Sequence, residues 1–154
     1  MMTAKLVNLQ RRVPISPRRI TQTARRALRD LGRPDSLVQL TVVDDARIRR
    51  LNARYRRRRR RTDVIAFALA VPGPSPLWGE IVISADTARR QARRLRIPVG
   101  LELDLLVVHG LLHLAGYDDS EPREARLMHE REREILERAR GTVAARLWTD
   151  LLPG

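Results

Sequence analysis

The sequence predicts an α+β fold, with helices packed on a mixed sheet of about four strands in a single domain covering residues 1–154. The length of 154 residues suits one domain with a hydrophobic core of its own. Stretches rich in valine and leucine are mixed with stretches of helical periodicity, which favours a mixed class. Hydrophobic residues make up 43% of the chain and aromatic residues only 3%, so aliphatic side chains must form most of the core.

Strands are expected where β-branched and aliphatic residues cluster between turn residues. The first of these stretches ends before Pro14, and the prolines of the stretch 72–79 place it in a loop, because proline cannot donate a hydrogen bond to a sheet. The expected strands cover residues 5–13, 36–45, 63–70 and 80–84.

Helices are expected where apolar residues recur every three or four positions and a capping residue precedes them. Pro17 suits a first helical position, and Gly32 suits the end of the same helix. The residues expected to cap helices are Ser16, Asp44 or Asp45, Ser84 or Asp86, and Ser120. The expected helices cover residues 16–32, 46–56, 87–96, 101–116, 120–141 and 142–152, and the helix 101–116 is apolar nearly all round, which predicts that it is buried.

The charge of the chain indicates a polyanionic partner. Its net charge is +13, and Lys5 is the only lysine, so arginine supplies nearly all of the excess. The chain has no cysteine, which excludes disulfides and thiolate metal sites. No stretch approaches the roughly 20 apolar residues of a membrane span, and the first residues lack the apolar core of a signal peptide. We therefore expect a cytoplasmic protein with no membrane partner.

Two of the three histidines lie four residues apart in the apolar stretch "HGLLHLAGYDD", residues 109–119. On a helix this spacing places His109 and His113 on one face, where both imidazoles can reach the same metal ion. Gly116 predicts the end of the helix, and the turn after it can return Asp118 or Asp119 toward the histidines. Two histidines and one carboxylate leave a coordination position open, as in catalytic zinc sites. The alternative is that both histidines are ordinary helix residues bonded to the backbone.

The residue after the first histidine argues against a zinc peptidase. Peptidases with a His-Glu-x-x-His helix use that glutamate as a general base, whereas this chain has Gly110 at the position. Glycine instead allows another backbone or a substrate to approach closely.

At these residues the sequence resembles the YbeY family, metal-dependent endoribonucleases of rRNA maturation. "HGLLHLAGYDD" resembles the family signature His-Gly-x-Leu-His-Leu-x-Gly-Tyr-Asp-His. "LNARYRRRRRRTDVIAF", residues 51–67, resembles its Leu-Asn-x-x-Tyr-Arg segment followed by Thr-Asp-Val-Leu-Ser-Phe, and "GEIVIS", residues 79–84, resembles its Gly-Asp-Ile-x-Ile-Ser strand. Met128 also matches a methionine of the family. The resemblance covers roughly residues 35–137.

The resemblance implies a ligand set for one divalent metal ion, Zn²⁺. His109 and His113 match the first two ligands, whereas the third family histidine is replaced by Asp119. Aspartate is a competent zinc ligand, but its charge should leave a bound water less acidic and move selectivity toward harder ions such as manganese. His129 is the rival third ligand, and Asp118 is a candidate to orient the ligands. Loss of the metal altogether is the remaining alternative.

The arginine run from position 56 to 61 is expected to follow RNA phosphates. Arg56 matches the arginine of the family's Tyr-Arg pair, which the resemblance implicates in activity, and its guanidinium can bind a phosphate through two hydrogen bonds. The structural alternative is a flexible basic loop that stays solvated. The residues of the run are Arg56, Arg57, Arg58, Arg59, Arg60 and Arg61.

The expected function is that of a metal-dependent endoribonuclease that prefers single strands and acts in rRNA maturation and ribosome biogenesis. Its expected partners are single-stranded RNA, above all rRNA, and the ribosome or its assembly factors. No general base can be assigned from the sequence, and metal-bound hydroxide would suffice. Two other classes stay open: a non-catalytic RNA-binding protein associated with the ribosome, and a metallohydrolase of another bond.

Overall fold

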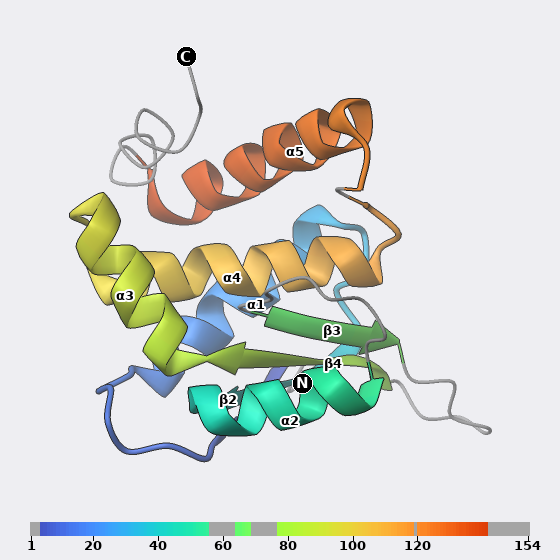
Figure 1. The fold of residues 1–154 in the computed structure, drawn as a ribbon. Helices are drawn as coiled ribbons and strands as arrows, with labels where there is room; N and C mark the ends of the chain where they lie inside the picture. The colour runs from blue at the N-terminus through green and yellow to red at the C-terminus, as the bar shows by residue number, and fades with distance from the viewer. Residues whose placement is uncertain (1–3, 56–63, 69–76, 119, 142–154) are drawn as a thin grey trace.

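The computed structural model of this protein describes residues 4–55, 64–68, 77–118 and 120–141, which contain both strands and helices. Figure 1 shows the helices packed on a small sheet, so the expected α+β class is confirmed. Among the described residues the strands are β1 (Ala4–Asn8), β2 (Leu37–Val43), β3 (Val64–Ala68) and β4 (Leu77–Ser84). The helices are α1 (Pro17–Asp30), α2 (Asp45–Tyr55), α3 (Ala85–Leu95), α4 (Val99–Leu114) and α5 (Pro122–Arg140).

The sheet is mainly parallel. Its strand order is β1-β2-β4-β3. β1, β2 and β4 run parallel to one another, with Leu6 opposite Leu40 and Leu40 opposite Ile81, whereas β3 pairs antiparallel with β4. The expected mixed sheet of about four strands is thus a three-stranded parallel sheet with one antiparallel strand at its edge. Parallel pairing requires crossover connections, and α1 supplies the one between β1 and β2.

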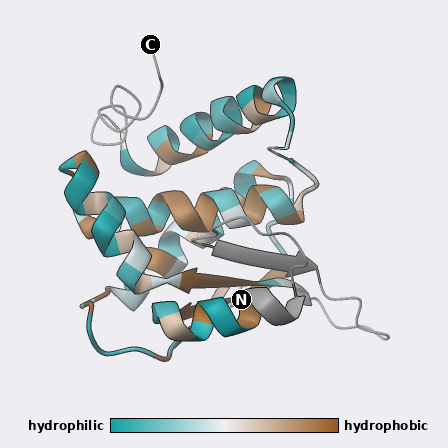
Figure 2. Ribbon diagram, viewed as in Figure 1, coloured by the Kyte–Doolittle hydropathy of each residue, from teal (hydrophilic) through white to brown (hydrophobic). Residues whose placement is uncertain are grey.

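The main core lies between the sheet and the buried helix α4. Leu40, Ile81 and Ile83 point from the sheet into this core and meet Val107 and Leu111 of α4, and all five side chains are fully buried. Figure 2 shows the hydrophobic residues concentrated on α4 and β4, whereas α3 and α5 carry many hydrophilic ones. The expectation that this helix is buried is confirmed, because residues on every side of it are shielded from solvent.

A smaller cluster covers the other face of the sheet. Val43 of β2 and Val82 of β4 pack there against Ile48 of α2. In Figure 1, α2 lies on one side of the sheet, α4 lies on the other, and α5 lies over α4 on the side away from the strands. The arrangement leaves the carboxyl-terminal end of α4 beside α5.

Gly110 marks the closest approach of α4 to the sheet. A Cβ atom at this position would lie 2.8 Å from Cγ2 of Ile81, which is closer than carbon atoms normally pack. The glycine therefore serves the contact between helix and strand. The sequence predicts that a backbone or a substrate approaches Gly110, whereas the neighbour in the structure is the side chain of a strand residue.

A buried carboxylate joins three helices. Asp104 of α4 is fully buried, and its Oδ2 accepts hydrogen bonds from Nη2 of Arg19 at 2.8 Å and from Nε of Arg140 at 2.9 Å. Its Oδ1 accepts one from the Thr23 hydroxyl at 2.8 Å. A buried carboxylate is tolerated when positive and polar partners compensate it, and here α1 and α5 supply them.

Several expected boundaries are confirmed and others are wrong. Ser16 caps α1 by accepting a hydrogen bond from the Arg19 amide, Asp44 caps α2 through the Arg47 amide, and Ser84 caps α3 through the Thr87 amide. The first strand ends at Asn8 and not at residue 13, because the Gln10 side chain bonds both the amide and the carbonyl of Val13 and forms a local turn.

Two further boundaries differ from the sequence prediction. β4 begins at Leu77, so the last part of the stretch expected to be a loop is paired with β2. Ser120 does not cap the last described helix; its amide and hydroxyl both donate to Asp118, and α5 begins at Pro122 without a side-chain cap. The helix expected at 142–152 lies outside the described residues. Within the described residues, membrane-spanning length and apolarity are not met by any single helix, and α3 and α4 meet them only as a pair bent by 118°.

Candidate metal site

The two histidines of α4 lie side by side at the end of the helix. Their Nε2 atoms are 3.0 Å apart, and their ring planes meet at 83°. Two nitrogens that bind one zinc ion tetrahedrally at about 2.0–2.1 Å are separated by about 3.3 Å. The pair therefore has nearly the spacing that a shared ion requires, and the structure brings together His109 and His113 as the sequence predicts.

The other ring nitrogens are held by oxygen acceptors. Nδ1 of His109 lies 2.5 Å from Oε1 of Glu132, and Nδ1 of His113 lies 3.1 Å from the Tyr117 carbonyl oxygen. A carboxylate and a carbonyl can only accept, so each Nδ1 must carry the proton. When both rings are neutral, the two Nε2 atoms present lone pairs to each other at 3.0 Å, an arrangement that a shared cation, either a metal ion or a proton, stabilises. The donor set thus fits a metal ion.

The turn after α4 positions the acceptor for His113. Gly116 has φ +100°, a left-handed conformation that glycine adopts without strain. The Tyr117 amide bonds the Leu112 carbonyl at 3.0 Å, and the Gly116 amide bonds the His113 carbonyl at 3.1 Å, which together form a Schellman motif. The expected helix end at Gly116 is confirmed, and the motif turns the Tyr117 carbonyl toward the His113 ring.

Glu132 is a site residue that the sequence reasoning missed. It lies on α5 and is 2% exposed, and its second oxygen is 3.5 Å from Nδ1 of His129. Burial raises the pKa of the Glu132 carboxyl, but hydrogen bonds from His109 and His129 and their charge outweigh burial and lower the pKa below its ordinary value of 4.5. A carboxylate bonded to a metal-ligating histidine fixes its tautomer and its orientation.

A sequence signal for Glu132 exists. The buried residues of α5 are Met128, Glu132, Ile135 and Leu136, so the glutamate occupies the apolar stripe at helical spacing from Met128. A carboxylate in such a stripe needs a buried partner, and the histidine pair is the available one.

The third metal ligand stays a prediction. Asp119 lies outside the described residues, and no group of three potential ligands is present among the residues that the structure describes. Asp118 is half-buried, and its carboxylate accepts hydrogen bonds from Ser120. His129, the rival third ligand, is placed beside Glu132 and half exposed, with 48% of its side chain accessible. Arg56 and the rest of its run lie outside the described residues as well.

The fold and the histidine pair define a class of protein: a small α+β protein whose buried helix ends in a candidate catalytic metal site. The family model described as Endoribonuclease YbeY matches residues 5–140. The chain belongs to this family.

Individual relatives agree with the family model. The chain is 46% identical over 147 residues to an Endoribonuclease YbeY from Anaeromyxobacter sp. (strain Fw109-5), covering 95% of this chain and 76% of the relative. It is 41% identical over 141 residues to an Endoribonuclease YbeY from Geobacter metallireducens, covering 87% of this chain and 93% of the relative. Its fold is similar to the solution structure of TM1509 from Thermotoga maritima, with a TM-score of 0.62, 25% identity and 98% of both chains covered.

Proposed function

We propose that this chain is a metal-dependent endoribonuclease that cuts single-stranded RNA in rRNA maturation in the cytoplasm. Its membership of the YbeY family supports the reaction class. The structural observation that carries the metal dependence is the pair of Nε2 atoms 3.0 Å apart, each on a ring whose Nδ1 is committed to an oxygen acceptor. The net charge of +13 favours an RNA partner.

The residues have distinct roles in this proposal. His109, His113 and Asp119 hold one divalent ion, and the two imidazoles favour Zn²⁺. When bound, such an ion polarises a phosphoryl oxygen and makes a coordinated water more acidic. Glu132 and the Tyr117 carbonyl keep both rings oriented with Nε2 toward the ion.

Arg56 is proposed to bind the scissile phosphate. A guanidinium can donate two parallel hydrogen bonds to a phosphate and stabilise the charge that develops on it during cleavage. We expect Arg56→Ala to lower the cleavage rate more than it weakens RNA binding, because charge stabilisation is strongest in the transition state. Equal losses in cleavage and binding would reduce Arg56 to an affinity residue, as proposed for the rest of its run.

The test combines metal analysis with an RNA cleavage assay, both with and without chelator. We expect the purified protein to hold one zinc ion and to lose cleavage when the ion is removed. His113→Ala should lose both the bound zinc and the RNA cleavage, because a metal ligand is removed. Asp119→Ala should lose stoichiometric zinc as well; retention of full zinc would exclude Asp119 as the third ligand.

Other outcomes of the same assays separate the remaining functions. Metal-free protein that binds RNA at full strength and never cuts it would identify a non-catalytic RNA-binding protein of the ribosome. Cleavage of a peptide library without cleavage of RNA would identify a metallohydrolase of another bond. Association with ribosomes or assembly factors is part of the proposal and is tested by co-sedimentation of the protein with ribosomal subunits.

A further inference from the structure

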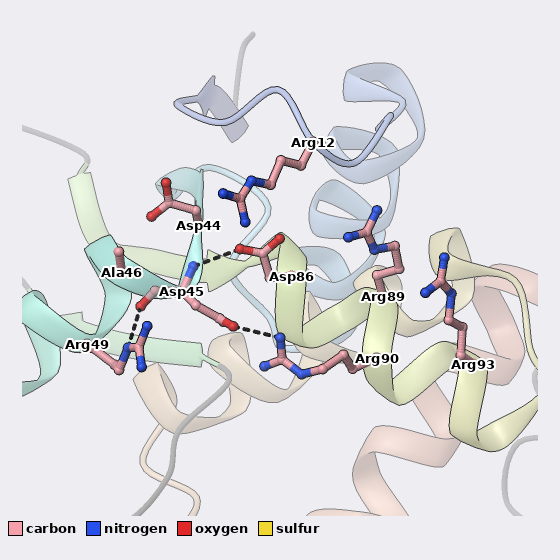
Figure 3. Close-up of a pocket in the computed structure, with 9 residues that line it drawn as sticks. All are labelled: Arg12, Asp44, Asp45, Ala46, Arg49, Asp86, Arg89, Arg90 and Arg93. Carbon is pink, nitrogen blue, oxygen red and sulfur yellow. Dashed lines mark hydrogen bonds and ion pairs between the residues drawn. The ribbon is translucent and has the colours of Figure 1, made fainter.

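A pocket rich in arginine lies where β2 and β4 end and where α2 and α3 begin (Figure 3). Its volume is about 380 Å³, in the range of small-ligand sites. We call it the basic pocket and define it by the five arginines of its lining, Arg12, Arg49, Arg89, Arg90 and Arg93. Ala46 is its only apolar lining residue within the described part of the chain. Such a lining suits an anion and offers nothing to a base or an acyl chain.

The acidic residues of the basic pocket are already engaged in local structure. Asp44 accepts the Arg47 amide at 2.8 Å, and Asp86 accepts the Asp45 amide at 3.0 Å. Asp45 pairs with Arg90 at 2.7 Å and also accepts hydrogen bonds from two hydroxyl groups. These carboxylates cap helices and hold Arg90 in place, so the basic pocket owes its affinity for anions to its remaining arginines.

Three arginines supply uncompensated charge. Among the described residues, Arg12, Arg89 and Arg93 form neither hydrogen bonds nor ion pairs with their side chains. Figure 3 shows Arg12 entering from the loop after β1, whereas Arg89 and Arg93 enter from α3. Guanidinium groups without a partner that share one pocket repel one another, and a bound anion relieves this repulsion.

We propose that the basic pocket binds a backbone phosphate of the RNA substrate, away from the histidine pair. The inference rests on the proposed ribonuclease function, and it adds a second contact for the same strand. The planar guanidinium matches the phosphate group, and the near absence of apolar lining among the described residues makes the contact independent of base sequence. The strongly positive net charge favours RNA over other anions.

The distance between the two sites gives the proposal a length requirement. In Figure 1, α3 and the start of α4 lie at one end of the sheet, and the histidine-bearing end of α4 lies at the other. The 16 residues of α4 extend about 24 Å. At roughly 3.4 Å per phosphate, a stacked RNA strand of about seven phosphates covers the length of α4, which sets the scale of the separation between the two sites.

The experiment compares two double variants in RNA binding. Arg89→Ala with Arg93→Ala removes two charges from the basic pocket. Arg47→Ala with Arg50→Ala removes two exposed charges from α2 that do not line the basic pocket. Binding of a labelled RNA of about twenty nucleotides and of one of about four nucleotides is measured by fluorescence anisotropy across a salt series, after circular dichroism has verified folding.

For the longer RNA we expect the pocket variant to raise the dissociation constant roughly tenfold. The slope of log affinity against log salt should decrease in magnitude by about 0.7 for each phosphate that the variant no longer neutralises. The control variant should change the dissociation constant and the salt slope much less. For the short RNA, which cannot bridge both sites, we expect the pocket variant to lose much less affinity than it loses for the longer RNA, because binding at the histidine site alone remains. Arg89→Lys with Arg93→Lys keeps the charge and should restore the salt slope better than the affinity.

Two results would overturn the proposal, and a third would bear on the nuclease function only. One is an equal loss of binding in the pocket and control variants, which would show a general electrostatic effect. Another is inorganic phosphate that binds the wild type but not the pocket variant while RNA binding stays unchanged, which would assign the pocket to small phosphate ligands. Wild-type protein that binds RNA and never cuts it would refute the nuclease function alone, because the pocket contact is still measured by binding.

Discussion

At the scale of single residues, Glu132 fixes the geometry of the candidate metal site from a different helix. Its carboxylate bonds Nδ1 of His109 from a buried position on α5. Neutral imidazole binds a metal through one nitrogen only, so the acceptor on Nδ1 determines that Nε2 faces the ion. Glu132 is therefore a positioning residue, and its charge should matter more than its size.

We expect Glu132→Gln to lower zinc affinity about 10–100-fold, because the amide still accepts a hydrogen bond but no longer carries the negative charge that stabilises a cation bound at His109. Glu130→Gln, an exposed substitution on the same helix, is the matched control. Competition against a fluorescent zinc chelator measures the zinc affinity of each variant. Equal affinities of the two variants would remove Glu132 from the metal site.

Gly110 yields a prediction about stability. Alanine is favoured over glycine in a helix by about 1 kcal/mol, but its Cβ would lie 2.8 Å from the Ile81 side chain. Overpacking of this kind costs about 1–3 kcal/mol, so Gly110→Ala should lower the free energy of unfolding by up to about 2 kcal/mol. The control is Gly100→Ala on the same helix, where the nearest atoms, at 3.1 Å, belong to the end of the Arg19 side chain. Urea denaturation measures the free energy of unfolding of the two variants. Stabilisation by both substitutions would contradict the predicted overpacking against Ile81.

The residues of the site were predictable to different degrees. The spacing of His109 and His113 and the position of Gly116 determine local geometry, so the sequence sufficed for them. The contact of His109 with Glu132 joins positions 23 residues apart, and it depends on how α5 docks on α4. No local pattern determines that docking, and only the unusual carboxylate in an apolar stripe pointed to it.

At the scale of elements, capping decides where helices begin. Ser16 bonds the amide of Arg19, whereas Ser120 bonds Asp118. Both serines precede a proline closely and look alike in the sequence. Asp118 competes successfully for Ser120, because an aspartate two residues before an amide readily forms a local turn.

We expect Ser16→Ala to lower the free energy of unfolding by about 1 kcal/mol, since an amide at the start of α1 loses its acceptor. Ser120→Ala should change it by less than about 0.5 kcal/mol, because the exposed Ser120 side chain caps no helix. Thermal or urea unfolding of the two variants side by side provides the measurement. A larger decrease in Ser120→Ala would assign the cap of α5 to that serine.

The boundaries of the strands were harder to predict than those of the helices. β4 extends back to Leu77 because β2 offers it a partner as far as Leu37. β1 is cut short by the Gln10 side chain. In both cases the boundary depends on a neighbouring segment or a side-chain hydrogen bond, and the composition of the strand itself does not reveal either.

At the scale of the whole molecule, charge affects stability as well as binding. Burial of the Asp45 carboxyl raises its pKa, but hydrogen bonds from Arg90, Ser84 and Thr87 and the charge of Arg90 lower it from 3.8 to about 2. The folded state therefore binds this proton less readily than the unfolded state. The stabilisation is complete above about pH 3.8 and is lost as the pH falls toward about 2.

We expect Asp45→Asn to flatten the pH dependence of the unfolding midpoint in this window, because the substituted residue no longer titrates. Urea denaturation at several pH values between about 5 and about 2 measures the effect. The matched control is Asp35→Asn, since that carboxyl is exposed and forms no side-chain hydrogen bond or ion pair among the described residues. If Asp45→Asn and the wild type lose stability in parallel over this range, another carboxylate causes the acid sensitivity.

The Asp104 cluster has a consequence for the order in which the chain folds. The Asp104 carboxylate accepts hydrogen bonds from Arg19 of α1 and from Arg140 of α5, so this cluster is complete only after α5 has docked. The same docking event brings Glu132 to His109. Contacts between such distant segments form late, because the entropy of closing long loops opposes them. Under the proposed function, metal acquisition is therefore a late step of biogenesis, and a ribosome-bound chain that has not yet released α5 should hold its ion more weakly than the finished protein.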